Sequence, residues 1–123
     1  MMRETLEFFK LLSDETRFRV IMLLMEEELA VCELVGILDL PQPKVSKALA
    51  KLRDLGLVVD QRKEKYMYYS INPEKERFIR ILKETKGTCS NLCLVAQDAK
   101  KLKEKSYTPI CCDIDKNSVK GDE

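Results

Sequence analysis

The stretch that decides the fold is Pro41-Gln42-Pro43-Lys44-Val45-Ser46-Lys47-Ala48-Leu49-Ala50-Lys51-Leu52-Arg53-Asp54-Leu55-Gly56. Its apolar residues recur at intervals of three and four, as on the buried side of a helix: Val45, Ala48, Leu49, Leu52 and Leu55. Pro43 suits a first helical turn and Gly56 a left-handed stop. The cations lie off the apolar stripe and give this helix a basic outer face: Lys44, Lys47, Lys51 and Arg53.

The segments on either side complete a recognisable pattern. Residues 29–38 read as a short extended piece followed by a compact apolar helix, which Asp39-Leu40-Pro41 ends. Residues 57–62 and 66–71 are rich in strand formers and predict a hairpin, although the tip at 63–65 lacks the glycine or asparagine typical of such turns. We therefore expect a mainly α fold with a small β-hairpin, a winged helix-turn-helix.

This arrangement suits duplex DNA, because the major groove admits one helix and the phosphates attract lysine and arginine. The charge is distributed accordingly: residues 1–41 carry −5, residues 42–70 carry +4 and residues 71–123 carry +2. At the amino-terminal end of the basic helix we expect contacts to base edges from Gln42, Lys44, Ser46 and Lys47. We expect phosphate contacts from Lys51, Arg62, Lys63 and Lys65. Ordinary solvated side chains on a small mixed domain would leave a similar pattern.

The remaining segments predict further helices around this unit. The opening helix has apolar residues at 2, 6, 9 and 12, with Phe8 and Leu11 beside that stripe, and this surplus suggests contact with a second subunit. Ser13 and Asp14 predict a cap for the next helix. The expected buried side of that helix consists of Phe18, Ile21, Met22, Leu24 and Met25.

The carboxyl-terminal third predicts two more helices. Asn72-Pro73 predicts the start of one that continues toward Gly87, and a final helix is expected over 90–105. We expect residues 1–105 to form one DNA-binding and dimerisation domain. Residues 106–123, which include Cys111-Cys112, are expected to form a flexible tail.

Composition narrows the class of protein. The 123 residues are 45% hydrophobic and 35% charged, which fits one folded domain with much solvated helix surface. No apolar run approaches the roughly 18 residues of a membrane span, and the amphipathic start is unlike an export signal. We expect a cytoplasmic protein without membrane contact.

Five cysteines and no histidine make a disulfide framework unexpected in the reducing cytosol and exclude histidine chemistry. No nucleophile has an evident base beside it, so an enzyme is not expected.

Several ordered blocks carry a family resemblance. Leu12-Ser13-Asp14-Glu15-Thr16-Arg17-Phe18-Arg19-Val20 resembles the second-helix start of the ArsR/SmtB family of metal-responsive repressors. Further matches are Glu28-Leu29-Ala30-Val31-Cys32-Glu33-Leu34, Val45-Ser46 with Leu49 and Leu52, Gly56-Leu57-Val58, and Tyr68-Tyr69. The resemblance covers residues 5–72. It implies a homodimeric repressor that joins through its first and last helices, binds an inverted-repeat operator, and releases it on binding a metal or metalloid.

The chain departs from the family's sensing sites. Arsenic-responsive members of the family often carry two or three cysteines in the third-helix segment, whereas this chain has Ala30, Cys32 and Val35 there. Zinc- and nickel-responsive members place histidine on the last helix, and this chain has none. We expect Cys32 to be a small buried structural residue.

We hypothesise that the four late cysteines form an alternative sensing site; otherwise Cys93 is a small buried apolar residue and the two tail cysteines are incidental. Cys89 and Cys93 are spaced i, i+4 and would share a face if one helix includes both, while Cys111-Cys112 is a vicinal pair. Thiolates alone select As(III), Sb(III), Cd, Pb or an all-cysteine Zn site. Trivalent arsenic takes three thiolates, so we hypothesise that Cys89 and Cys93 bind it with Cys111 or Cys112.

Three other functions remain open at this stage. A thiol redox repressor would release DNA when its cysteines oxidise to a disulfide. A protein that sequesters metal through cysteine would not bind DNA at all. A repressor with no inducer would behave identically with every cysteine replaced.

Overall fold

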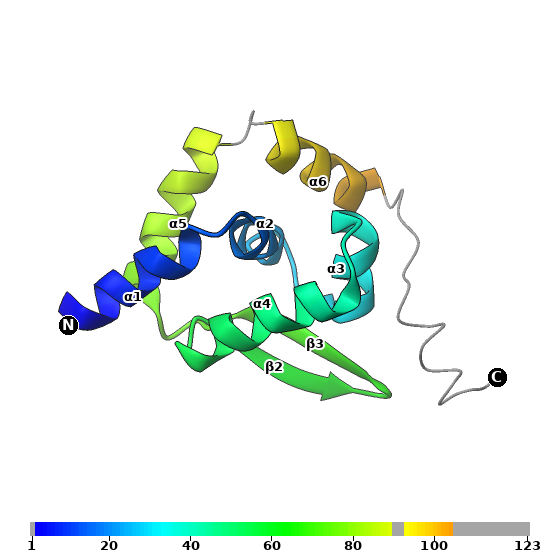
Figure 1. Cartoon of the computed structure of the whole chain (residues 1–123), viewed down its shortest axis with the longest axis horizontal. Coiled ribbons are helices and arrows are strands. Elements are labelled where there is room, and N and C mark those ends of the chain that lie inside the picture. The colour runs from blue at the N-terminus through cyan, green and yellow to red at the C-terminus, as the bar shows by residue number, and fades with distance from the viewer. Residues whose placement is uncertain (1, 90–92, 105–123) are drawn as a thin grey trace.

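The computed structural model describes residues 2–89 and 93–104. Figure 1 shows α2 end-on in the middle of the molecule, with the other helices around it and the hairpin of β2 and β3 below α4. The predicted winged helix-turn-helix is confirmed. The elements are α1 (Met2–Leu12), α2 (Glu15–Leu24), β1 (Leu29–Ala30), α3 (Val31–Leu38), α4 (Gln42–Asp54), β2 (Val58–Lys63), β3 (Tyr66–Ile71), α5 (Glu76–Cys89) and α6 (Cys93–Glu104).

The central position of α2 explains its composition. Its amino terminus is capped by Asp14, whose carboxylate accepts a hydrogen bond from the Arg17 N–H at 3.1 Å. Ser13 does not share this cap, because its hydroxyl donates to the Lys10 carbonyl at 2.7 Å and so satisfies the end of α1. Val20 and Leu23 are buried in addition to most of the predicted stripe, since other elements pack on several sides of the helix.

The apolar residues of α1 divide into two faces. Phe8 is fully buried and stacks on Phe78 of α5 with ring centroids 4.3 Å apart. Met2, Leu6 and Phe9 remain 75%, 57% and 49% exposed. The side of α1 with Phe8 therefore packs in the core. Most of the apolar stripe at positions 2, 6, 9 and 12 is exposed and is the apolar surface that the core does not use.

The helix-turn-helix and its wing follow the sequence pattern closely. Asp39 ends α3 in the left-handed conformation at φ 58°, and Gly56 follows α4 at φ 84°. The sheet is antiparallel in the order β1-β3-β2. The pairing of β1 with β3 was not predicted, because a two-residue strand is too short to show a period of two.

The predicted start of the fifth helix was wrong. α5 begins at Glu76, because Asn72 forms a turn in which its side chain accepts from the Glu74 N–H at 3.0 Å and donates to the Gly56 carbonyl at 2.9 Å. The helix then continues through Gly87 to Cys89, since a single glycine weakens a helix without ending it.

The last described helix, α6, spans Cys93–Glu104, inside the expected range of 90–105, and residues 90–92 lie outside the described residues. The proposed tail, residues 106–123, lies outside the described residues. Within the described part, no helix is long and apolar enough to cross a membrane.

Candidate functional site

The basic face of α4 is divided between two environments. Lys44, Lys47 and Lys51 are exposed, and none of them forms an ion pair with a described side chain. Arg53 instead donates to the Asp60 carboxylate of β2 at 2.9 Å, and this hydrogen bond raises the pKa of Arg53. Arg53 thus links the wing to α4 through a partly exposed ion pair, while the three lysines remain available to a polyanion.

The predicted base-contacting residues lie together at the amino end of α4. Gln42 is its first residue, and Lys44, Ser46 and Lys47 follow within two turns. Gln42 and Ser46 are half-buried, whereas the two lysines are exposed. A helix end of this kind carries both neutral hydrogen-bonding groups and positive charge.

Arg62 and Lys63, both predicted to contact phosphates, lie on opposite faces of the wing. Arg62 is paired with Met67 and Lys63 with Tyr66, so strand alternation directs the Arg62 and Lys63 side chains to opposite faces. Lys63 donates to Glu28 at 2.7 Å and lies 5.5 Å from the Tyr68 ring centroid. Its charge is therefore already partnered.

The other two basic residues of the wing are differently placed. Arg62 and Lys65 are exposed, and neither forms an ion pair with a described side chain. They are therefore the wing cations most open to an external anion.

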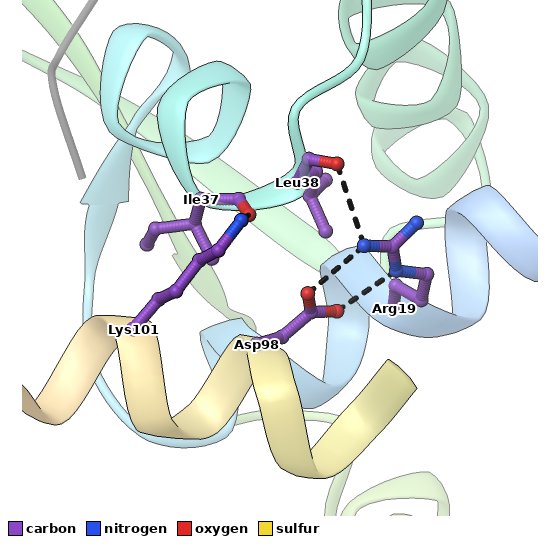
Figure 2. Close-up of polar contacts among 5 residues, drawn as sticks. All are labelled: Arg19, Ile37, Leu38, Asp98 and Lys101. Carbon is purple, nitrogen blue, oxygen red and sulfur yellow. Dashed lines mark hydrogen bonds and ion pairs between the residues drawn. The ribbon is translucent and has the colours of Figure 1, made fainter. Parts of the chain in front are cut away.

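A buried polar network joins three helices behind this surface (Figure 2). The Arg19 guanidinium of α2 donates to both carboxylate oxygens of Asp98 in α6, at 2.8 and 2.9 Å. The two side chains are only 11% and 4% exposed. The hydrogen bond to Asp98 raises the pKa of Arg19.

The same network reaches the end of the first helix of the helix-turn-helix. Arg19 also donates to the Leu38 carbonyl at 3.4 Å, and Lys101 of α6 donates to the Ile37 carbonyl at 3.1 Å. These cations neutralise the negative carboxyl end of α3. Helix α6 is thus tied to the turn that leads into α4.

Sequence reasoning missed this network. Arg19 and Asp98 are separated by 79 positions, and nothing local to either residue indicates the other. A weak signal existed, because Asp98 falls within the otherwise apolar spacing of Val95, Ala99 and Leu102. A carboxylate on the buried side of a helix requires a cationic partner.

The structure does not place Cys89 and Cys93 on one helix. Cys89 is the last residue of α5 and Cys93 the first of α6, so the condition for a shared helical face, one helix that includes both, is not met. Residues 90–92, which separate the two cysteines in the sequence, lie outside the described residues.

Of the remaining three cysteines, the structure describes Cys32 alone. Cys32 is buried, as predicted, and it is disulfide-bonded, which was not expected from the sequence. Cys111 and Cys112 lie outside the described residues. Within residues 2–89 and 93–104, no group of three or more histidine, cysteine or acidic residues could hold a metal ion.

Comparison with known proteins connects this surface to a family. The pattern described as "Bacterial regulatory protein, arsR family" matches residues 14–59. The "Arsenic resistance transcriptional regulator ArsR1" of Pseudomonas putida is 39% identical over 109 residues, covering 85% of this chain and 84% of that protein. The "Arsenical resistance operon repressor" of Escherichia coli K12 is 45% identical over 69 residues, covering 55% and 59% respectively.

A solved structure of a similar protein has a similar fold. Reduced HlyU from Vibrio cholerae has a TM-score of 0.60 and 28% identity, covering 68% of this chain and 90% of that one.

Proposed function

The chain belongs to the ArsR family of bacterial regulatory proteins, and on that premise we propose that it is an operator-binding repressor released by a thiophilic metalloid. The observation that carries the proposal is the match over 85% of the chain to an arsenic resistance regulator. The family and its structural neighbours are transcription regulators and not enzymes. Binding to operator DNA also implies a cytoplasmic location.

DNA binding is supported by the position of the unpaired cations. In this proposal the amino end of α4 enters the major groove, where Gln42, Lys44, Ser46 and Lys47 contact base edges. Phosphates are contacted by Lys51 from α4 and by the wing residues Arg62, Lys63 and Lys65. Lys63 must exchange its ion pair with Glu28 to do so, and we expect it to contribute the least of these.

The homodimer is supported by α1. Met2, Leu6 and Phe9 form one exposed apolar stripe, since they are spaced by four and three residues along the helix. Such a stripe fits a second copy of the same chain. The exposed described residues of α6 are all polar, namely Gln97, Lys100, Lys103 and Glu104, so we expect α1 to contribute most of the apolar contact.

The inducer site is proposed on the carboxyl-terminal thiols. Cys89 and Cys93 are four positions apart, a span that even an extended chain limits to roughly 14 Å. With Cys111 or Cys112 they supply the three thiolates that As(III) or Sb(III) takes, while Cd, Pb or Zn would use all four. We propose these four residues as the ligand set, from one chain or across the dimer.

The contacts of α6 suggest how such a site reaches the DNA. A metalloid that draws α5 and α6 together would displace Asp98 and Lys101. Asp98 contacts the end of α3 through Arg19, and Lys101 contacts it directly. The recognition helices of a dimer must match half-sites about 34 Å apart, so a small tilt weakens binding. A coupling of about 3 kcal/mol corresponds to roughly a hundredfold loss of affinity.

The experiment is a competition on the DNA upstream of the protein's own coding sequence. Purified reduced protein is bound to that duplex and titrated separately with arsenite, antimonite, cadmium, lead and zinc. We expect release by arsenite and antimonite. The Cys89→Ser/Cys93→Ser variant should bind DNA normally and resist release. Normal release of this variant by arsenite would refute the ligand set, and absence of DNA binding would favour a metal-sequestering protein.

A second candidate function is favoured by one observation, the disulfide at Cys32. In a thiol redox repressor, two thiols lose two electrons and two protons to an oxidant such as a peroxide, and the resulting disulfide shifts the DNA affinity. Peroxide and arsenite titrations separate the two functions. A Cys32→Ser variant that still responds to arsenite but no longer to peroxide would assign Cys32 to redox control alone.

A further inference from the structure

A basic pocket lies beside the recognition helix α4. Its volume is about 290 Å³, and it opens between the amino-terminal turn of α2 and the exposed face of α4. The polar lining residues are Asp14, Thr16, Arg17, Lys44, Lys47 and Lys51. Four cations thus face one carboxylate.

The charges in the pocket are left for an external anion. Asp14 already accepts the Arg17 N–H as the cap of α2. The Arg17 side chain is held by a hydrogen bond from Nε to the Leu11 carbonyl at 2.9 Å, which directs the guanidinium without neutralising it. None of the four cations has an ion pair with a described carboxylate.

Thr16 is the second and independent observation. The residue is 7% exposed and lines the pocket, and its hydroxyl has no hydrogen-bond partner among the described residues. Buried hydroxyls are normally satisfied, so an unpartnered one facing a basic pocket indicates a missing acceptor. The first N–H groups of α2 add a partial positive charge at the same place.

We propose that this pocket binds one phosphate of the DNA backbone, with Thr16 donating its hydroxyl and Arg17 its guanidinium, and this rests on the proposed operator binding. A phosphodiester is a tetrahedral oxyanion, which suits a pocket of several donors with net positive charge. The pocket shares Lys44 and Lys47 with the surface that faces the groove. A phosphate seated there would fix the depth and the register of α4 in that groove.

The test compares matched variants on operator and unrelated duplexes over a range of salt. Arg17→Gln and Thr16→Val each remove one proposed donor. The control Arg80→Gln removes the same charge from an exposed residue of α5, which does not line the pocket. We expect Arg17→Gln to weaken binding about tenfold on both duplexes and to reduce the slope of log K against log salt by about 1. Thr16→Val should weaken binding about threefold to tenfold with little change in slope, because it carries no charge.

The contrary outcomes are distinct. If unaltered protein binds operator but both pocket variants bind like Arg80→Gln, the pocket is refuted and the proposed function stands. If the unaltered protein binds no duplex, both the phosphate pocket and the proposed operator binding are refuted. If inorganic phosphate stabilises the protein through Arg17 while DNA affinity is unaffected by the variants, the site takes a free anion and the DNA assignment is overturned.

Discussion

Asp98 of α6 accepts two hydrogen bonds from Arg19 of α2, and both side chains are almost completely removed from water. The geometry is bidentate, which is the strongest form of an arginine–carboxylate contact. Because the same guanidinium also reaches the Leu38 carbonyl, one residue connects the last helix to the helix-turn-helix.

Removing one partner of this pair should destabilise the fold strongly. Asp98→Asn leaves Arg19 buried without a counter-charge, and we expect the free energy of unfolding to fall by about 3–5 kcal/mol. Urea denaturation measures this free energy of unfolding. The matched control is Asp60→Asn, which breaks the more exposed pair with Arg53 and should cost less than about 1 kcal/mol. Equal effects of the two substitutions would refute a structural role specific to the buried pair.

Two glycines should respond to alanine with opposite signs. At Gly87 a Cβ would meet nothing within 4 Å in a helix, so Gly87→Ala should stabilise the protein by about 0.5–1 kcal/mol. At Gly56, φ is +84° and a Cβ would lie 3.3 Å from Cε of Lys75. Gly56→Ala should therefore destabilise it by roughly 1–2 kcal/mol. Thermal unfolding of both variants decides this, and changes of the same sign would contradict the assigned backbone conformations.

The tip of the wing holds a residue poorly suited to its backbone. Glu64 has φ 58°, a conformation that glycine adopts without steric conflict. Glu64→Gly should raise stability by roughly 0.5–1 kcal/mol, because the relief of strain exceeds the entropy lost by glycine. Lys65→Gly is the control, since φ at Lys65 is not positive, and it should destabilise the hairpin. Proton exchange of the β2 and β3 amides reports on both.

Local pattern was sufficient for most of the fold. The stripe of α4, the stop at Gly56 and the Asp14 cap each depend on neighbouring residues, and the structure confirms all three. Asn72-Pro73 misled the prediction of α5, because a turn and a helix start share the same local chemistry.

The candidate site was less predictable. The spacing of Cys89 and Cys93 predicted one shared face only if a single helix included both, and the chain forms two helices there. Partners distant in sequence were also missed, as with Arg19 and Asp98 or with Lys63 and Glu28, because charge spacing along one element says nothing of the element packed against it.

The contact between α1 and the chain preceding α5 should depend on pH. A hydrogen bond from Lys75 at 2.7 Å lowers the pKa of Glu4 below its ordinary value of 4.5. Because the folded-state pKa is depressed, this contact stabilises the fold above that value, and the contribution is lost as the pH falls through the lowered pKa. Glu4→Gln should therefore lower the unfolding midpoint at neutral pH but not in acid. Glu7→Gln, an exposed neighbour without a described ion pair, should change little at either pH, and a pH-independent effect of Glu4→Gln would contradict the assignment.

The most direct measurement is the dissociation constant of the reduced protein for its upstream DNA, with and without arsenite. We predict nanomolar to micromolar binding that weakens about a hundredfold with arsenite. The Cys111→Ser/Cys112→Ser variant should bind the DNA equally well and lose that response. Unchanged affinity of the unaltered protein in saturating arsenite would contradict a metalloid-released repressor.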